Sequence, residues 1–198
     1  MKRNLSFTCS IFGVVTYLLF TILATRAFPG SYSPLTNWLS DLGSNKLNPS
    51  GAMFYNVGIA TSGLFTFFVF LGLHSLATAG NKKQNVVLFL TQVFGCLGSL
   101  AMVMSALFPI TMSGVHSILS AVLYILLGTS FALSAAALRY YSKYPKGLLL
   151  LGILIAVEDL VFGLVLNIYI LEWVTVILFL SYILVLGIAT RLKPAFAE

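Results

Sequence analysis

Six apolar runs, each about as long as a bilayer is thick, constrain the fold of this chain more than any other feature of its sequence. A hydrocarbon core about 30 Å thick requires roughly 20 residues of α-helix. The six runs cover approximately residues 5–25, 52–76, 86–110, 115–138, 147–166 and 173–190. In lipid, runs of this length can satisfy their backbone hydrogen bonds only as helices. The sequence therefore predicts an all-α membrane protein, a bundle of six transmembrane helices forming one domain over residues 1–198.

The composition supports this prediction and excludes several classes of protein. Hydrophobic residues make up 59% of the chain and charged residues 8%, whereas about 25% charged is usual in soluble domains. The cations lie scattered between the apolar runs, so no nucleic-acid partner is expected. Cys9 and Cys96 show no metal-ligand spacing, and His74 and His116 lie toward opposite membrane surfaces. We therefore expect no metal, haem or other cofactor.

The distribution of Lys and Arg predicts the orientation in the membrane. If the amino terminus is inside, all of the 11 Lys and Arg residues except Arg26 and Lys46 lie on the inner side. Cytoplasmic loops are enriched in these residues, so both termini are expected in the cytoplasm. We expect a multi-pass protein of the cytoplasmic (plasma) membrane.

The first outer loop, residues 29–51, is the longest polar stretch in the chain. Ser33 suits an N-cap, Pro34 suits the first helical position and Gly43 suits the helix stop. The loop is therefore expected to contain a short amphipathic helix over residues 34–42, with apolar residues repeating at helical spacing. Its polar face would hold Asn37, Ser40 and Asp41. Two arrangements remain open: a helix lying on the headgroups, or a lid whose polar face turns down onto the bundle.

Two adjacent carboxylates, Glu158 and Asp159, lie inside the fifth apolar run. An ionised, unpaired carboxylate costs about 2.5 kcal/mol or more at such a depth, so both should face protein or water. Asp159 falls on a stripe of small residues that suits helix packing, and we expect it to point inward. Glu158 lies about 100° around the helix and should face a neighbouring helix or the cavity edge. In the alternative interpretation both carboxyls are neutral and structural.

Polar residues at the outer ends of the other runs are candidates for the same pocket. They are Arg26, Asn56, His116 and Asn167, with Tyr169 and Glu172 at a similar depth. We expect Arg26 to pair with Asp41 or with a carboxylate of the fifth run, unless it only extends to the interface. In this hypothesis Arg26 contacts an anion, Ser40 and Asp41 form hydrogen bonds, and Asp159 is the buried charge beneath. Asn56 and His116 form the pocket wall.

Three stretches of the chain resemble a known family. They are YSPLTNWLSDLG, FYNVGI and ALFPI, the last shortly before His116. Together they are similar to the six-span family numbered 998 among the domains of unknown function. In this chain the family's polar signature falls on Arg26, Ser40, Asp41, Asn56, Pro109 and His116, and the Glu158-Asp159 pair is not part of it. The resemblance implies the fold and the topology, and it implies no activity.

Function follows from the pocket only as a ranked hypothesis. We expect an outward-facing polar pocket that binds a lipid headgroup or small amphiphile, with membrane lipid as the partner. The first alternative is a non-catalytic subunit that contacts other membrane proteins. The second is a membrane-embedded lipid hydrolase or transferase. For the second alternative, Ser40, Asp41 and His116 could form a triad, although adjacent Ser and Asp seldom reach one imidazole.

Overall fold

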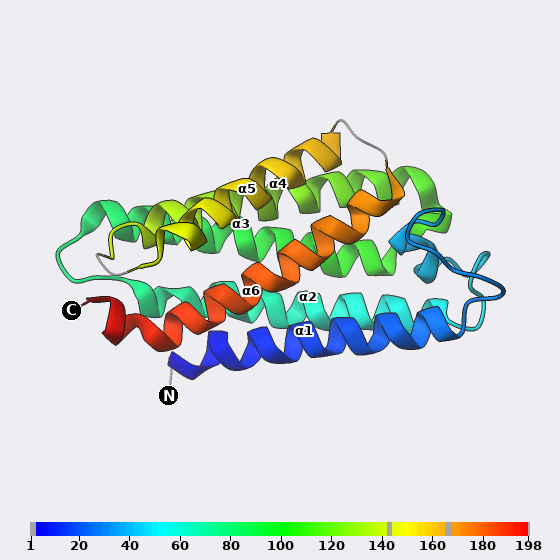
Figure 1. Ribbon diagram of the computed structural model, residues 1–198, viewed down its shortest axis with the longest axis horizontal. Helices are drawn as coiled ribbons and strands as arrows, with labels where there is room; N and C mark the ends of the chain where they lie inside the picture. Colours follow the sequence, from blue (N-terminus) through cyan, green and yellow to red (C-terminus); the bar gives the residue numbers. More distant parts are fainter. Residues whose placement is uncertain (1–2, 142–143, 165–167, 198) are drawn as a thin grey trace.

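The computed structural model describes residues 3–141, 144–164 and 168–197, and these residues form helices, turns and loops without any strand. Six α-helices run along the length of an elongated bundle (Figure 1). They are α1 (Arg3–Arg26), α2 (Ala52–Gly72), α3 (Lys82–Leu107), α4 (Ser113–Leu138), α5 (Lys146–Leu164) and α6 (Tyr169–Ala197). Three 3₁₀ helices accompany them: η1 (Leu39–Gly43), η2 (Leu73–Leu76) and η3 (Ile110–Met112).

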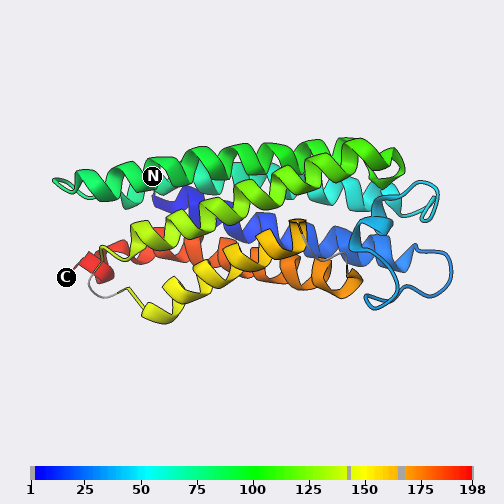
Figure 2. The same cartoon turned by 90° about the horizontal axis from the view of Figure 1, so that it is seen from above.

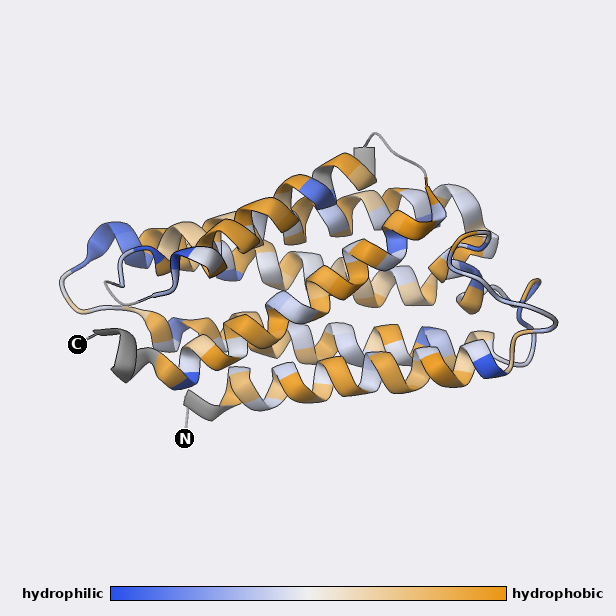
Figure 3. Ribbon diagram, viewed as in Figure 1, coloured by the Kyte–Doolittle hydropathy of each residue, from blue (hydrophilic) through white to orange (hydrophobic). Residues whose placement is uncertain are grey.

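Five of the described helices are long and apolar enough to cross a bilayer. They span Leu5–Arg26, Ala52–Leu76, Lys82–Leu107, Ile110–Leu138 and Tyr169–Leu192. The protein is therefore an integral membrane protein with an all-helical bundle, as its sequence predicts. The described part of α5 is shorter and is not among these five. Figure 3 shows the apolar residues distributed along the helices, with polar residues gathered at both ends of the bundle.

Local sequence signals determine where several helices begin and end. The Asn81 side chain accepts a hydrogen bond from the Gln84 N–H at 3.0 Å and so caps the start of α3. The third apolar run was predicted to extend to residue 110, but α3 ends at Leu107. Phe108 has a ψ of 77° outside the helical region, because the ring of the following Pro109 disfavours helical geometry in the preceding residue.

The helices form a ring in the order α1, α2, α3, α4, α5 and α6, and the contact between α5 and α6 is the sparsest between neighbours in it. Figure 2 shows the same bundle from above, with α5 lying beside α4 and α6 beside α1. Aromatic side chains such as Phe70, Phe131 and Tyr182 fill the interior and are completely buried. Gly95 lies against the Phe70 ring, where any Cβ would collide with it, so a glycine is needed for α2 and α3 to approach there.

Both described ends of the chain lie at one end of the bundle, and the first loop covers the other end (Figure 1). The helix predicted over residues 34–42 is wrong in its extent, because only the 3₁₀ helix η1 forms. Asn37 Oδ1 accepts the Ser33 N–H at 3.2 Å, and Ser33 Oγ accepts the Leu35 N–H at 3.3 Å. These side chains bond to backbone groups near the start of the predicted helix and hold a turn instead. Trp38 then adopts an extended backbone, with ψ at 146°.

The loop packs onto the bundle through its second half. Leu39 and Leu42 are completely buried, whereas Leu35 is 71% exposed. The Asn48 side chain donates to the carbonyl oxygens of Ala24 and Leu42 at 3.1 and 2.9 Å, which joins the loop to the end of α1. The residues around η1 therefore cover the end of the bundle.

Candidate binding site

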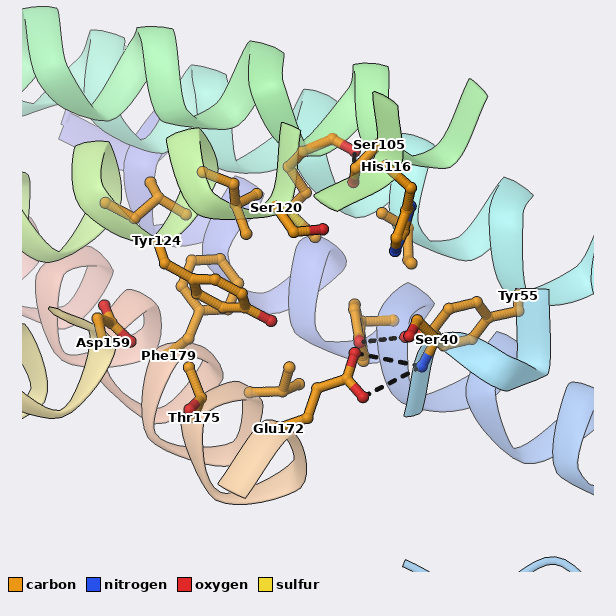
Figure 4. Close-up of a pocket in the computed structure, with 16 residues that line it drawn as sticks. Ser40, Tyr55, Ser105, His116, Ser120, Tyr124, Asp159, Glu172, Thr175 and Phe179 are labelled. Atoms are coloured by element: carbon orange, nitrogen blue, oxygen red, sulfur yellow. Dashed lines mark hydrogen bonds between the residues drawn. The ribbon is translucent and has the colours of Figure 1, made fainter. Parts of the chain in front are cut away.

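A cavity of about 60 Å³ lies beneath η1, between the helices. Its polar lining consists of Tyr17, Ser40, Tyr55, Ser105, His116, Ser120, Tyr124, Asp159, Glu172 and Thr175. Its apolar lining consists of Ile59, Met102, Leu123, Leu127, Val176 and Phe179. All six α-helices and η1 contribute (Figure 4). A volume of this size can hold a few water molecules or one small polar group.

A wider hollow of about 500 Å³ adjoins the cavity. It follows α4 from Ser113 to Tyr124 and is bounded by Trp38 of the loop, Phe162 of α5 and Glu172 of α6. Five residues line both spaces: Ser40, His116, Ser120, Tyr124 and Glu172. The small polar cavity is therefore continuous with a larger and more open groove beside α4.

Glu172, in the first turn of α6, connects the loop to the bundle. Its Oε2 accepts the Leu39 N–H at 2.6 Å, and its Oε1 accepts the Ser40 N–H at 3.2 Å. The carboxyl-bearing side chain is buried, at 8% exposed. The first N–H groups of a helix have no partner within the helix, and here a residue more than 130 positions away supplies the acceptor. Glu172 thus holds η1 over the cavity.

The sequence analysis placed Glu172 at the correct depth but not among the site residues. Two sequence signals favour it. An acidic residue in the first turn of an apolar span is costly in lipid and should have a partner, and a buried loop helix needs an acceptor for its free N–H groups. Neither signal identifies the other, because only the packing brings them together.

Asp159 lies deeper in the cavity, in the part beyond Tyr124 in Figure 4. It is 2% exposed, and its Oδ1 has no hydrogen-bond partner among the described residues. It packs against Gly128 of α4, where an added Cβ would lie 3.1 Å from the Asp159 Cβ. The structure therefore directs Asp159 inward, and a glycine on α4 makes the room for it.

Glu158 has a different environment although it is the adjacent residue. Its Oε1 accepts the Thr175 hydroxyl at 2.7 Å, so the side chain faces α6. Glu158 does not line the cavity, whereas Thr175 does. The two carboxylates thus point to different surroundings, Asp159 into the cavity and Glu158 along its edge.

His116 forms the wall of the cavity near the loop. Its Nδ1 lies 2.9 Å from the Phe108 carbonyl oxygen. A carbonyl oxygen can only accept, so Nδ1 carries the hydrogen, and in the neutral ring Nε2 is left as an acceptor. Because Nδ1 is occupied by this carbonyl, Asp41 does not orient the ring. The triad of Ser40, His116 and Asp41 considered from the sequence is therefore not assembled.

Asp41 supports the loop and does not line the cavity. Its Oδ2 accepts the Trp38 N–H at 3.0 Å, and burial raises the pKa of its carboxyl above the ordinary value of 3.8. Arg26 is exposed at the end of α1. The ion pair predicted between Arg26 and Asp41 is absent from the described residues, because the last turn of α1 directs Arg26 away from η1.

The remaining candidates also serve the loop. The Asn56 side chain donates to the Gly43 carbonyl at 3.0 Å, and Asn37 holds the turn at the loop's start. Asn167 lies outside the described residues. Of the residues proposed from the sequence, the structure brings Ser40, His116 and Asp159 to one cavity. Arg26, Asn37, Asp41, Asn56 and Glu158 do not line it.

The comparison with known proteins concerns the whole of this arrangement. No curated protein and no solved structure matches the chain. The family described as "Protein of unknown function (DUF998)" matches residues 11–189. This range contains all six apolar runs in whole or nearly so, the first loop and every residue that lines the cavity. The motifs around Ser40, Asn56 and His116 had indicated the same family, and the chain belongs to it.

Proposed function

We propose that this protein binds an amphiphile, with its polar head in the cavity beneath η1 and its apolar part in the groove beside α4. The observation that carries the proposal is the continuity of the two spaces. The small cavity contains hydroxyl, imidazole and carboxyl groups next to apolar side chains, and the groove that joins it is much larger. Such a mixture of apolar walls and a few converging polar groups is typical of ligand sites.

The proposed position in the membrane follows from the charge distribution. We propose that α5 also crosses the bilayer, which makes six spans with both termini in the cytoplasm of a plasma-membrane protein. The end covered by η1 is then the outer end. In this orientation a lipid of the outer leaflet would reach the cavity from the side of α4.

Native mass spectrometry of the full chain released from lipid nanodiscs tests the proposal. Ser120 lines both the cavity and the groove, so Ser120→Phe should fill the site and remove the bound amphiphile. Ile118 lies two residues away on α4 and is 67% exposed. Ile118→Phe therefore adds an aromatic ring outside the site and serves as the matched control. The wild type and Ile118→Phe should retain an amphiphile that Ser120→Phe loses.

Two outcomes would contradict the proposal. One is a wild-type protein that carries no amphiphile under conditions that preserve its fold. The other is the same bound mass in all three proteins, which would place the ligand elsewhere on the surface.

The alternative as a complex subunit has less support in the structure. The small-residue stripe of α5 was expected to meet partner helices, but Gly152 lies against the Tyr182 side chain and Ala156 is 5% exposed. The stripe is used within the chain. The subunit hypothesis stays a prediction, and the hydrolase hypothesis needs an arrangement other than the triad with Asp41.

A further inference from the structure

We infer that the site selects an amphiphile whose polar head carries an ammonium group, and that Asp159 is the group that recognises it. This inference rests on the proposed function, because it concerns the ligand of the same cavity. It begins from an imbalance of charge in the cavity lining. Among the described lining residues there are two carboxyl-bearing side chains, Asp159 and Glu172, and no Lys or Arg. Arg26, the cation once expected to contact an anion, is exposed outside the cavity.

The two carboxylates are not equivalent. Glu172 already accepts the backbone N–H groups of Leu39 and Ser40. Asp159 has no comparable partner: its Oδ1 forms no hydrogen bond with any described residue, and the side chain is 2% exposed. A buried carboxylate without a partner is costly, and a ligand that brings both hydrogen-bond donors and a positive charge would remove that cost. Asp159 therefore has unused capacity directed at the ligand.

The walls of the cavity also suit a cation. Aromatic rings of Tyr17, Tyr55, Tyr124 and Phe179 line it, and the faces of such rings attract ammonium groups. An anion would meet the opposite environment. A phosphate head would lose its hydration next to two acidic side chains without gaining a paired cation, which is strongly unfavourable.

The volumes indicate how such a ligand would lie. The cavity of about 60 Å³ accepts a small head such as a primary ammonium group, and an attached alkyl chain would extend into the groove of about 500 Å³. The required chemistry is an ammonium on an apolar chain. Its source is either a membrane lipid whose headgroup ends in an amine or a free amphiphilic amine.

Three probes of equal chain length test the inference on the full-length protein in dodecyl maltoside micelles. They are dodecylammonium, dodecyl phosphate and dodecanol, and their affinities are measured by native mass spectrometry and by ligand-induced thermal stabilisation. Dodecylammonium should bind most tightly. Loss of one charge-assisted contact should weaken it by about tenfold or more in Asp159→Asn, with dodecanol affected much less.

Glu158→Gln is the matched control, because it removes the adjacent carboxylate, which faces Thr175 and not the cavity. It should leave the order of the three affinities unchanged. To identify the source, nanodiscs that contain phosphatidylethanolamine and phosphatidylglycerol are compared with and without added dodecylammonium. Retention of the amine lipid identifies a lipid, and retention of dodecylammonium alone identifies a free amine.

The outcomes separate the two proposals. If no probe and no lipid binds, the proposed function fails. If amphiphiles bind but dodecyl phosphate or dodecanol binds as well as dodecylammonium, the proposed function stands and the ammonium inference is overturned. This comparison uses the wild type alone, so it holds even if Asp159→Asn does not fold. An ammonium preference that persists undiminished in folded Asp159→Asn would also overturn the assignment to Asp159.

Discussion

The contact between Glu172 and η1 makes a prediction that can be followed from single atoms to a measured rate. Glu172→Gln keeps the shape of the side chain but replaces one carboxylate oxygen with an NH₂ group. The Gln carbonyl can accept from only one of the two N–H groups that Glu172 now satisfies, those of Leu39 and Ser40. Leu39 is completely buried, so water cannot replace the lost acceptor while the loop stays docked.

The size of the effect follows from the type of bond. A hydrogen bond to a charged group contributes about 1.5–3 kcal/mol, and each 1.4 kcal/mol changes an equilibrium constant about tenfold. The free energy of opening the loop should fall by this amount. Amide hydrogens of residues 39–43 should then exchange roughly tenfold to a hundredfold faster, because local opening controls their exchange.

Hydrogen exchange measured by mass spectrometry on the purified protein provides the assay, with peptides that cover the loop compared against peptides from α2. Glu158→Gln is the control, since Glu158 bonds to Thr175 and not to the loop. Unchanged exchange at residues 39–43 in Glu172→Gln would refute the reasoning. So would an equal acceleration in α2, which would show that the substitution loosens the whole bundle instead of the loop.

Two other predictions concern packing and topology. In Gly128→Ala the new Cβ would lie 3.3 Å from a backbone oxygen of α5, which cannot move independently, so thermal unfolding should show a loss of about 1–3 kcal/mol. Gly114→Ala is the control because nothing lies within 4 Å of its Cβ position, and equal stability of both variants would contradict the close packing of α4 on α5. Single cysteines at the exposed positions Asn45 and Lys83, in a chain without its native cysteines, should react with an impermeant maleimide from opposite membrane sides. Labelling of both from one side would exclude the proposed topology.

Much of the fold could be read from the sequence because lipid leaves few alternatives. A long apolar run must bond its own backbone, so the existence and approximate bounds of the helices follow from hydropathy alone. Short-range signals were also reliable where no competitor was near, as at Asn81, which caps α3. They failed in the first loop, where the side chains of Ser33 and Asn37 compete for the backbone groups that a longer helix would need.

The composition of the site was harder to predict. The analysis of spacing selected Ser40, His116 and Asp159, and these residues line one cavity. It also selected Arg26, which is exposed, and omitted Glu172, which holds the loop. Depth in the membrane follows from counting residues along a helix, but the direction in which a side chain points does not. These helices are apolar on nearly every side, so their periodicity hardly marks an inward face.

The sequence by itself therefore determined that this is a helical membrane protein of a particular family, with a polar loop between its first two helices and a pair of carboxylates within its fifth. Only the tertiary structure decided that one of those carboxylates faces a cavity without a partner and that Glu172 meets η1. The physical reason lies in the range of the interactions. Backbone hydrogen bonds in lipid are local and can be read along the chain, whereas the rotation of each helix depends on close contacts between distant residues, such as Gly128 with Asp159.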